Sequence, residues 1–165
     1  MTTTSLVQAL PPEMKTLQTR PLFVFQADVK PASIIGACPG HDRRVGEVTG
    51  GRFEGERLRG RILSGGSDWQ SLRSDGALTL DVRFVMETDD KHLIGVTYRG
   101  MRHGPKEVIA RIGKGETVSP AEYYMRVVPF FETASDHYGW LNRLIGVAIG
   151  HRLPSGPIYH VFEIL

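Results

Sequence analysis

Two carboxylates in the sequence, Asp81 and Glu132, are set among apolar and aromatic residues, in Leu80–Phe84 and Phe130–Thr133. A carboxylate that loses hydration in apolar surroundings has a raised pKa, and it can then exchange protons near neutral pH. An Arg or Tyr124 would stabilise the negative charge that develops during such a reaction. The chemistry that these residues suggest is that of an isomerase, lyase or cyclase that needs no cofactor, with Asp81 or Glu132 as the general base.

A second group of side chains is suited to binding a ligand without reaction. Arg holds carboxylates through paired hydrogen bonds, and Trp and Tyr rings supply apolar walls. The candidates for ligand contact are Trp69, Arg83, Glu87, Arg99, Tyr124, Arg126, Trp140 and Asn142. They support the leading hypothesis of a small-molecule-binding protein whose partner is an organic molecule, either aromatic or carboxylate-bearing. The enzyme is the alternative.

Other motifs that could carry chemistry are incomplete. The run Gly46–Gly55 lacks the Gly-Lys-Ser/Thr ending of a phosphate-binding loop, and no helix pattern follows it. The six histidines lack the i, i+2 or i, i+4 spacing of metal ligands, so no metal site and no cofactor are predicted. Asp68 and Asp75 fall in segments predicted as turns, where Asp side chains bind their own backbone. Cys38 lies in a predicted loop and is expected to be inert.

The bulk composition narrows the class of protein. The chain has 165 residues, the size of one domain, and a formal net charge of +2 that gives no reason to expect nucleic-acid binding. Its 15 Arg against 5 Lys suit paired, partly buried positions more than a solvated surface. No apolar run approaches the roughly 18–20 residues of a membrane-spanning helix. One cysteine and no secretory signal indicate the cytoplasm.

The pattern of short apolar segments predicts an all-β fold. Residues 1–19 are polar and are expected to form a flexible N-terminal arm, followed by one β domain over residues 20–165. Turn signals separate about nine or ten strands at 8–12-residue spacing, as in a closed barrel or a sandwich. A turn is predicted at residues 64–69 and one short helix near residues 134–142. The predicted strands cover residues 22–29, 45–53, 58–63, 78–88, 93–99, 108–112, 122–132, 144–150 and 158–164.

Most of these strands have one apolar face and one face that bears Arg, a carboxylate or Tyr. In Leu78–Thr88, for example, Leu80, Val82 and Phe84 alternate with Asp81 and Arg83. The polar faces would be solvated, as antiparallel sheets usually are, or they would line a lumen that holds the ligand. The pattern leaves both alternatives open. An apolar outer face would also suit a homodimer.

An ordered series of motifs resembles the DUF3237 family, also called UPF0311. The resemblance covers about residues 20–165 and implies a compact, calycin-like β-barrel of the bacterial cytoplasm. It implies no catalytic residues, because the family name denotes unknown function. The motifs are the Gly-rich run at 46–55 and the segments 58–61, 65–69, 73–76, 80–83, 87–90, 99–100, 131–133 and 138–143.

Overall fold

A computed structural model of the chain describes residues 5–165. Its helices are α1 (Leu6–Ala9), α2 (Lys106–Gly113) and the 3-10 helices η1 (Pro12–Met14) and η2 (Gly139–Arg143). Its strands are β1 (Thr19–Val29), β2 (Ser33–Cys38), β3 (His41–Glu54), β4 (Arg59–Ile62), β5 (Gly66–Leu72), β6 (Leu78–Thr88), β7 (Leu93–His103), β8 (Tyr124–Glu132), β9 (Gly146–Leu153) and β10 (Gly156–Ile164).

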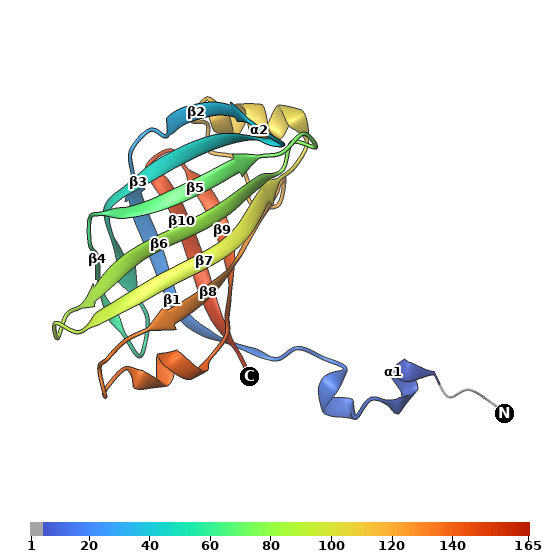
Figure 1. The fold of residues 1–165 in the computed structure, drawn as a ribbon. Coiled ribbons are helices and arrows are strands. Elements are labelled where there is room, and N and C mark those ends of the chain that lie inside the picture. The colour runs from blue at the N-terminus through green and yellow to red at the C-terminus, as the bar shows by residue number, and fades with distance from the viewer. Residues whose placement is uncertain (1–4) are drawn as a thin grey trace.

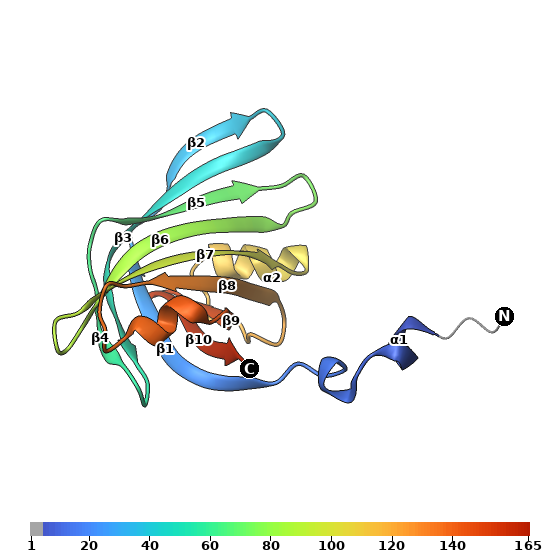
Figure 2. The same cartoon turned by 60° about the horizontal axis from the view of Figure 1, so that its bottom comes forward.

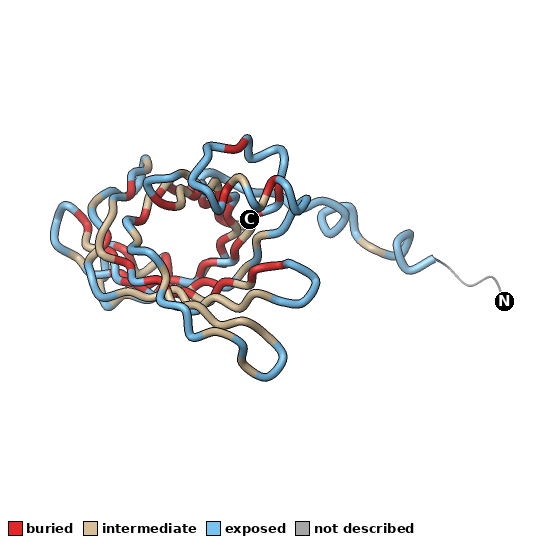
Figure 3. Tube along the Cα trace, turned by 90° about the horizontal axis from the view of Figure 1, so that it is seen from above, coloured by how far each residue is buried: buried red, intermediate tan, exposed pale blue. Residues whose placement is uncertain are grey.

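The strands form one closed antiparallel barrel, so the predicted fold class is confirmed. The hydrogen-bonded order runs from β1 through β10, β9, β8, β7 and β6, and pairing of β1 with β3 closes the ring (Figure 1; Figure 3). Between β6 and β3, the short strands β4 and β5 each cover part of the gap. Strand β2 pairs only with the first half of β3 and splays away from the ring (Figure 2).

The apolar strand faces point into the barrel. Along β6, buried and more exposed residues alternate over the whole strand, and Leu80, Val82 and Phe84 are all at most 5% exposed. The polar faces point outward, where the side chains of Arg83 and Arg99 are 63% and 76% exposed. On these strands the structure therefore selects the solvated alternative, since the apolar faces fill the closed interior.

Three local predictions from the sequence are wrong. Cys38, predicted to lie in a loop, is the last residue of β2, because pairing with His41 of β3 extends the strand to it. The segment predicted as a strand at residues 108–112 is helix α2, on which Val108 and Ile112 are buried four residues apart. An apolar run this short fits a helical face as well as a strand. The segment predicted as a turn at residues 64–69 is largely β5, because pairing with β3 and β6 extends it from Gly66. The predicted short helix near residues 134–142 corresponds to η2.

The N-terminal segment runs away from the barrel and carries α1 and η1 (Figure 1; Figure 2). Its described residues before β1 are almost all exposed, including Leu6 at 87%. Residues 1–4 of the predicted arm lie outside the described residues, and its flexibility and the domain division stay predictions. Within residues 5–165, no helix has the length and apolar character needed to span a membrane.

Candidate functional site

The barrel interior holds a cavity of about 580 Å³ at the end where β2 splays from the ring. A cavity of this volume lies in the range of ordinary small-molecule sites. Pro31, just before β2, Ile34 of β2 and Ile112 of α2 contribute to its lining. Apolar side chains from the inward strand faces form much of the remaining wall: Ala27, Val29, Val48, Leu78, Leu80, Val82 and Met125.

One carboxylate, Asp68, lines this cavity. It lies on the inward face of β5, opposite Gly46 of β3 and Val82 of β6. Burial raises the pKa of Asp68 to about 6, although the hydrogen bond from Gln70, the nearby backbone N–H of Asp81 and the charge of Arg102 act in the other direction. Gln70 occupies one carboxylate oxygen, Oδ2, at 2.6 Å. Within the described residues the other oxygen, Oδ1, is buried and has no hydrogen-bond partner.

Two buried tyrosines, Tyr98 of β7 and Tyr159 of β10, line the same cavity. Their ring centroids are 5.6 Å apart, and Tyr159 stacks on Phe25 of β1 at 4.9 Å. Burial raises the pKa of both phenols, and for each the charge of Asp68 contributes in the same direction. Both phenols therefore remain protonated at neutral pH and can donate hydrogen bonds.

A glycine on the neighbouring strand makes room for Tyr159. A Cβ atom at Gly150 of β9 would lie 2.6 Å from the Tyr159 ring and 2.8 Å from the side chain of Met125. The ring can therefore lie directly against the backbone of β9, its partner strand. This close approach fixes the phenol at the wall of the cavity.

Three arginines complete the polar lining: Arg44 of β3, Arg102 of β7 and Arg152 of β9. Burial lowers the pKa of Arg102, and the charge of Arg152 lowers it further. Nε of Arg44 and Nε of Arg102 are buried donors without an acceptor in the part of the chain that the structure describes. The cavity thus presents unused donors as well as an unused acceptor.

Tyr123, just before β8, supports one of these arginines from outside the cavity lining. Its hydroxyl accepts a hydrogen bond of 2.7 Å from the backbone N–H of Arg152. It also lies 3.0 Å from Nδ1 of His151. Tyr123 is buried, so the contact holds the end of β9 and the start of the Arg152 side chain in place.

Most of the amino-acid sequence matches one family model. Residues 17–164 match the model for "Protein of unknown function (DUF3237)". The chain belongs to this family. The UPF0311 protein RPA1785 of Rhodopseudomonas palustris is 31% identical to it over 150 residues, 91% of this chain and 98% of that protein.

Solved structures agree with the fold of this DUF3237 protein. The structure of RPA1785 covers 91% of this chain and 99% of its own, with a TM-score of 0.88. A "beta-barrel like protein" of Acinetobacter baumannii is 38% identical, with a TM-score of 0.81 and coverages of 96% and 100%. A protein of Penicillium herquei described as an enzyme shares the fold at 21% identity, with a TM-score of 0.69 and coverages of 90% and 95%.

The ten residues proposed from the sequence, all of them described, lie outside the interior cavity of this DUF3237 protein. Trp69, Asp81 and Arg99 meet in a shallow depression on the outer face of β5, β6 and β7. There Asp81 pairs with Arg99 at 3.3 Å and with Arg83 at 3.5 Å. The roles of the ten residues toward a ligand stay predictions. Among these ten described residues, this depression is the one place where three lie together and two of them form an ion pair.

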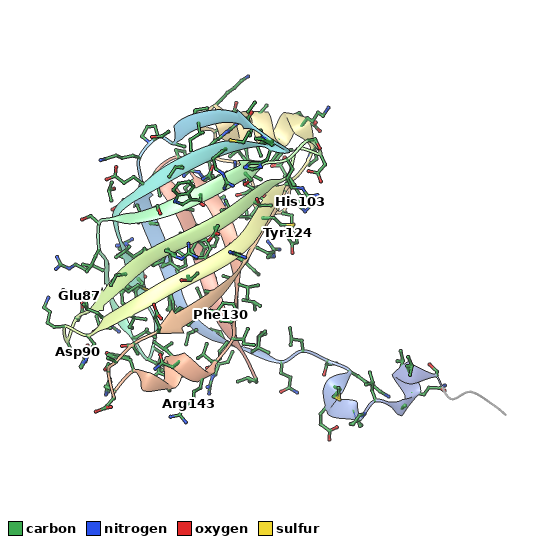
Figure 4. The ribbon with its side chains drawn as sticks, viewed as in Figure 1. Glu87, Asp90, His103, Tyr124, Phe130 and Arg143 are labelled. Atoms are coloured by element: carbon green, nitrogen blue, oxygen red, sulfur yellow. The ribbon has the colours of Figure 1, made fainter. Side chains whose placement is uncertain are left out.

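The remaining proposed residues are spread over three other places on the outside. Tyr124 and Arg126 line an apolar outer groove, and Tyr124 stacks on His103 at 4.9 Å (Figure 4). Glu132 and Asn142 line an open hollow at the opposite end. Glu87, near the β6–β7 hairpin in Figure 4, pairs with Arg61 and Lys91 at 3.0 Å each.

Trp140, the last of the ten, has a structural contact. The guanidinium of Arg57 lies 3.5 Å from the centroid of its ring, and Arg57 also pairs with the buried Glu163. A guanidinium over an indole face is attracted by the electrons of the ring. The contact connects η2 to the barrel, so Trp140 already has a partner in the fold.

Sequence reasoning missed the residues that line the cavity. It named Asp68 but gave it a turn role, because Gly65-Gly66-Ser67 precedes it. Tyr98 was placed on an apolar face, and Arg44, Arg102 and Arg152 were not singled out. One feature of the sequence could have identified them: a polar residue an even number of positions from the inward residues of its strand lies on the same face. Arg102, for example, shares the inward face of β7 with Tyr98. In residues 5–165, no group of three or more His, Cys, Asp or Glu side chains could hold a metal ion.

Proposed function

We propose that this protein binds a small organic molecule in the interior of its barrel. The observation that carries the proposal is the cavity lined by Asp68, Arg44 and Arg102, in which buried polar atoms have no partner. Buried polar groups in folded proteins are nearly always hydrogen-bonded, so a ligand in the cavity would supply partners that these groups lack. The apolar walls would receive the body of the ligand, and these polar groups would fix its orientation.

Cavity-filling variants test this proposal. Leu80→Trp places a larger ring in the cavity, whereas Val85→Trp enlarges a partly exposed outward residue of the same strand. Fragments that bind wild type, detected by saturation-transfer NMR in a set of aromatic and aliphatic acids and alcohols, should lose binding in Leu80→Trp and keep it in Val85→Trp. Because Leu80→Trp could unfold the barrel, Met125→Phe provides a milder change at the same cavity. Fragments that bind equally to all these folded variants would contradict an interior site.

A proton-transfer enzyme is the second candidate, favoured by the pKa of about 6 at Asp68. A general base works best when its pKa lies near the operating pH. Asp68 would remove a proton from a carbon of the ligand, and the phenol of Tyr98 or Tyr159 would stabilise the resulting negative charge. This chemistry needs no cofactor and moves the predicted base from Asp81 or Glu132 to Asp68.

Solvent exchange separates the two candidates. A ligand found in the fragment screen is incubated with the protein in D₂O, and loss of C–H signals is followed by proton NMR. An enzyme should catalyse exchange that Asp68→Asn abolishes while ligand binding persists. Asp81→Asn, on the outer face, should leave exchange unchanged. If the wild-type protein binds the ligand but catalyses no exchange, the result supports the binding protein and contradicts the enzyme.

Two further expectations from the sequence remain proposals. We propose the cytoplasm as the compartment, supported by a single free cysteine, Cys38. A homodimer through the outer sheet face is supported by exposed apolar side chains such as Val128, Phe130 and Ile149 on β8 and β9. Sedimentation velocity at micromolar concentration checks the second, and a monomer would refute it.

A further inference from the structure

The charges that line the interior cavity do not balance. Its charged side chains are Lys30, Arg44, Asp68, Arg102 and Arg152. Lys30 already binds Glu47, with Nζ at 2.9 and 3.0 Å from its carboxylate oxygens. Three guanidinium groups therefore face one carboxylate, and two positive charges remain even when Asp68 is ionised.

Several arginines outside the cavity are paired with carboxylates. Arg61 pairs with Glu87 at 3.0 Å, Arg99 pairs with Asp81 at 3.3 Å, and Arg111 pairs with two glutamates at 3.0 and 3.2 Å. Among the described residues, no carboxylate lies within ion-pair distance of Arg44, Arg102 or Arg152. Other arginines, such as Arg52 and Arg59, also have no ion pair, but they are exposed, whereas these three guanidinium groups line one cavity together.

This arrangement is unfavourable for the empty barrel. Burial lowers the pKa of Arg102 and of Arg152, which means that the charged form of each is less stable there than in water. The charge of Arg152 also lowers the pKa of Arg102. Unpaired buried charges of one sign are retained in proteins chiefly where an opposite charge binds.

The strand register places the cavity's polar groups on two levels. Arg44 pairs with Gln70 across β3 and β5, whereas Asp68 pairs with Gly46, a pairing that lies two residues later in β3 and two residues earlier in β5. Similarly, Arg102 and Tyr98 lie four residues apart on β7. Two residues of a strand span about 7 Å, so the backbone level of Asp68 lies about 7 Å or more from that of the arginines.

We propose that the ligand in this cavity is an organic carboxylate that also carries a separate hydroxyl group. This inference rests on the proposed function. The carboxylate binds the guanidinium groups of Arg102, Arg152 and Arg44, which supply the paired donors that it needs. The hydroxyl donates to the carboxylate of Asp68, whose Oδ1 has no hydrogen-bond partner within the described residues. The body between them packs on Leu80, Val82 and Met125.

The binding test uses matched small molecules at constant ionic strength. 4-Hydroxybenzoate carries both groups, 4-hydroxybenzamide lacks the charge, and benzoate lacks the hydroxyl. Isothermal titration calorimetry should give an affinity at least tenfold weaker for the amide than for the acid, because charge-assisted hydrogen bonds are lost. Arg102→Met should abolish this preference for the acid. Arg99→Met, an outward change on the same strand, should preserve it.

A second measurement does not depend on the choice of ligand. Without ligand, Arg102→Met and Arg152→Met should raise the melting temperature, because each removes an uncompensated charge. Arg102→Lys keeps the charge and should not raise it, and Arg99→Met should lower it or leave it unchanged. If Arg102→Met and Arg152→Met both lower the melting temperature as Arg102→Lys does, the two arginines are compensated within the fold and the inference is overturned.

The outcomes separate this inference from the proposed function. Equal binding of acid and amide in the cavity, located by shifts of backbone amide resonances around Tyr98 and Gln70, overturns the carboxylate but supports a small-molecule site. A second outcome overturns both the carboxylate ligand and the small-molecule site. In it, the resonances around Tyr98 and Gln70 remain unchanged with all three compounds, and Arg102→Met does not stabilise the protein.

Discussion

Gln70 donates a hydrogen bond of 2.6 Å to Oδ2 of Asp68, two residues before it on the inward face of β5. The contact uses Oδ2 of Asp68, and Oδ1 is buried without a hydrogen-bond partner within the described residues. The same pair determines how readily Asp68 ionises, because the hydrogen bond favours the charged form while burial opposes it.

The Gln70 hydrogen bond holds the pKa of Asp68 below the value that burial alone would give. In Gln70→Leu the ionised carboxylate loses this donor, and the pKa of Asp68 should rise above 6. Carbon-detected NMR of the Asp side-chain carboxyl during a pH titration measures it. The pKa of the exposed Asp75 in the same spectra serves as a control and should not move. A lower Asp68 pKa in the variant would mean that Gln70 does not stabilise the carboxylate.

Ionisation of Asp68 should make the fold less stable as the pH rises. The folded pKa of about 6 lies above the ordinary value of 3.8, so the folded protein keeps the proton longer than the unfolded chain. The stability from this group is complete below pH 4 and is lost as the pH rises through 6. At pH 7.5 the ionised group costs about 2–3 kcal/mol, which Asp68→Asn should relieve. Urea unfolding at pH 4.5 and 7.5 measures the difference.

Asp75 gives a control of opposite sign for this pH dependence. The backbone N–H of Ala77 and the side chain of Arg73 lower the pKa of Asp75. Its contribution is therefore present above the ordinary pKa and lost as the pH falls. Asp75→Asn should destabilise the protein at pH 7.5, whereas Asp68→Asn should stabilise it. The same sign for both variants would contradict the assignment of Asp68 to a buried, charge-unfavourable site.

The buried carboxylate of Glu163 joins the N-terminal end of β1 to the loop before β4. It binds Arg20, and it lies 3.2 Å from Nη1 of Arg57, which itself stacks on Trp140. Glu163→Gln weakens both charge-assisted hydrogen bonds and should lower the unfolding free energy by about 1–3 kcal/mol. Glu47→Gln, in the exposed pair with Lys30, should cost less than about 1 kcal/mol. Guanidinium unfolding measures both free energies, and equal losses in Glu163→Gln and Glu47→Gln would contradict a special role of Glu163.

Closure of the barrel depends on a glycine where β3 crosses β1. At Gly51, φ is +140°, and a Cβ atom would lie 2.2 Å from the carbonyl oxygen of Gln26. Gly51→Ala should therefore separate the two strands and destabilise the protein more than Gly40→Ala. Gly40 has φ +86° but open space around it, so Ala there costs only backbone strain, about 1–2 kcal/mol. Thermal unfolding compares the two, and equal losses would contradict close packing at Gly51.

The sequence by itself determined most of the strands and their two faces. The alternation in β6 and β7 follows from the period of an extended chain, so it is legible without a structure. The resemblance of the sequence motifs to the family indicated that these strands form a barrel. The helix α2 was misassigned because Val108 and Ile112 fit both a strand and a helix face over so short a run.

Tertiary structure alone decided which face was inside and which residues form the candidate site. Alternation does not say which side a closed sheet buries, and pairing with β3 and β6 turned the Asp68 segment into a strand. Arg44, Arg102 and Arg152 are far apart in the chain and share a cavity only because β3, β7 and β9 curve around one interior. The excess of Arg was visible in the sequence. Which arginines lack a counter-charge depends on long-range strand pairing, which no local pattern encodes.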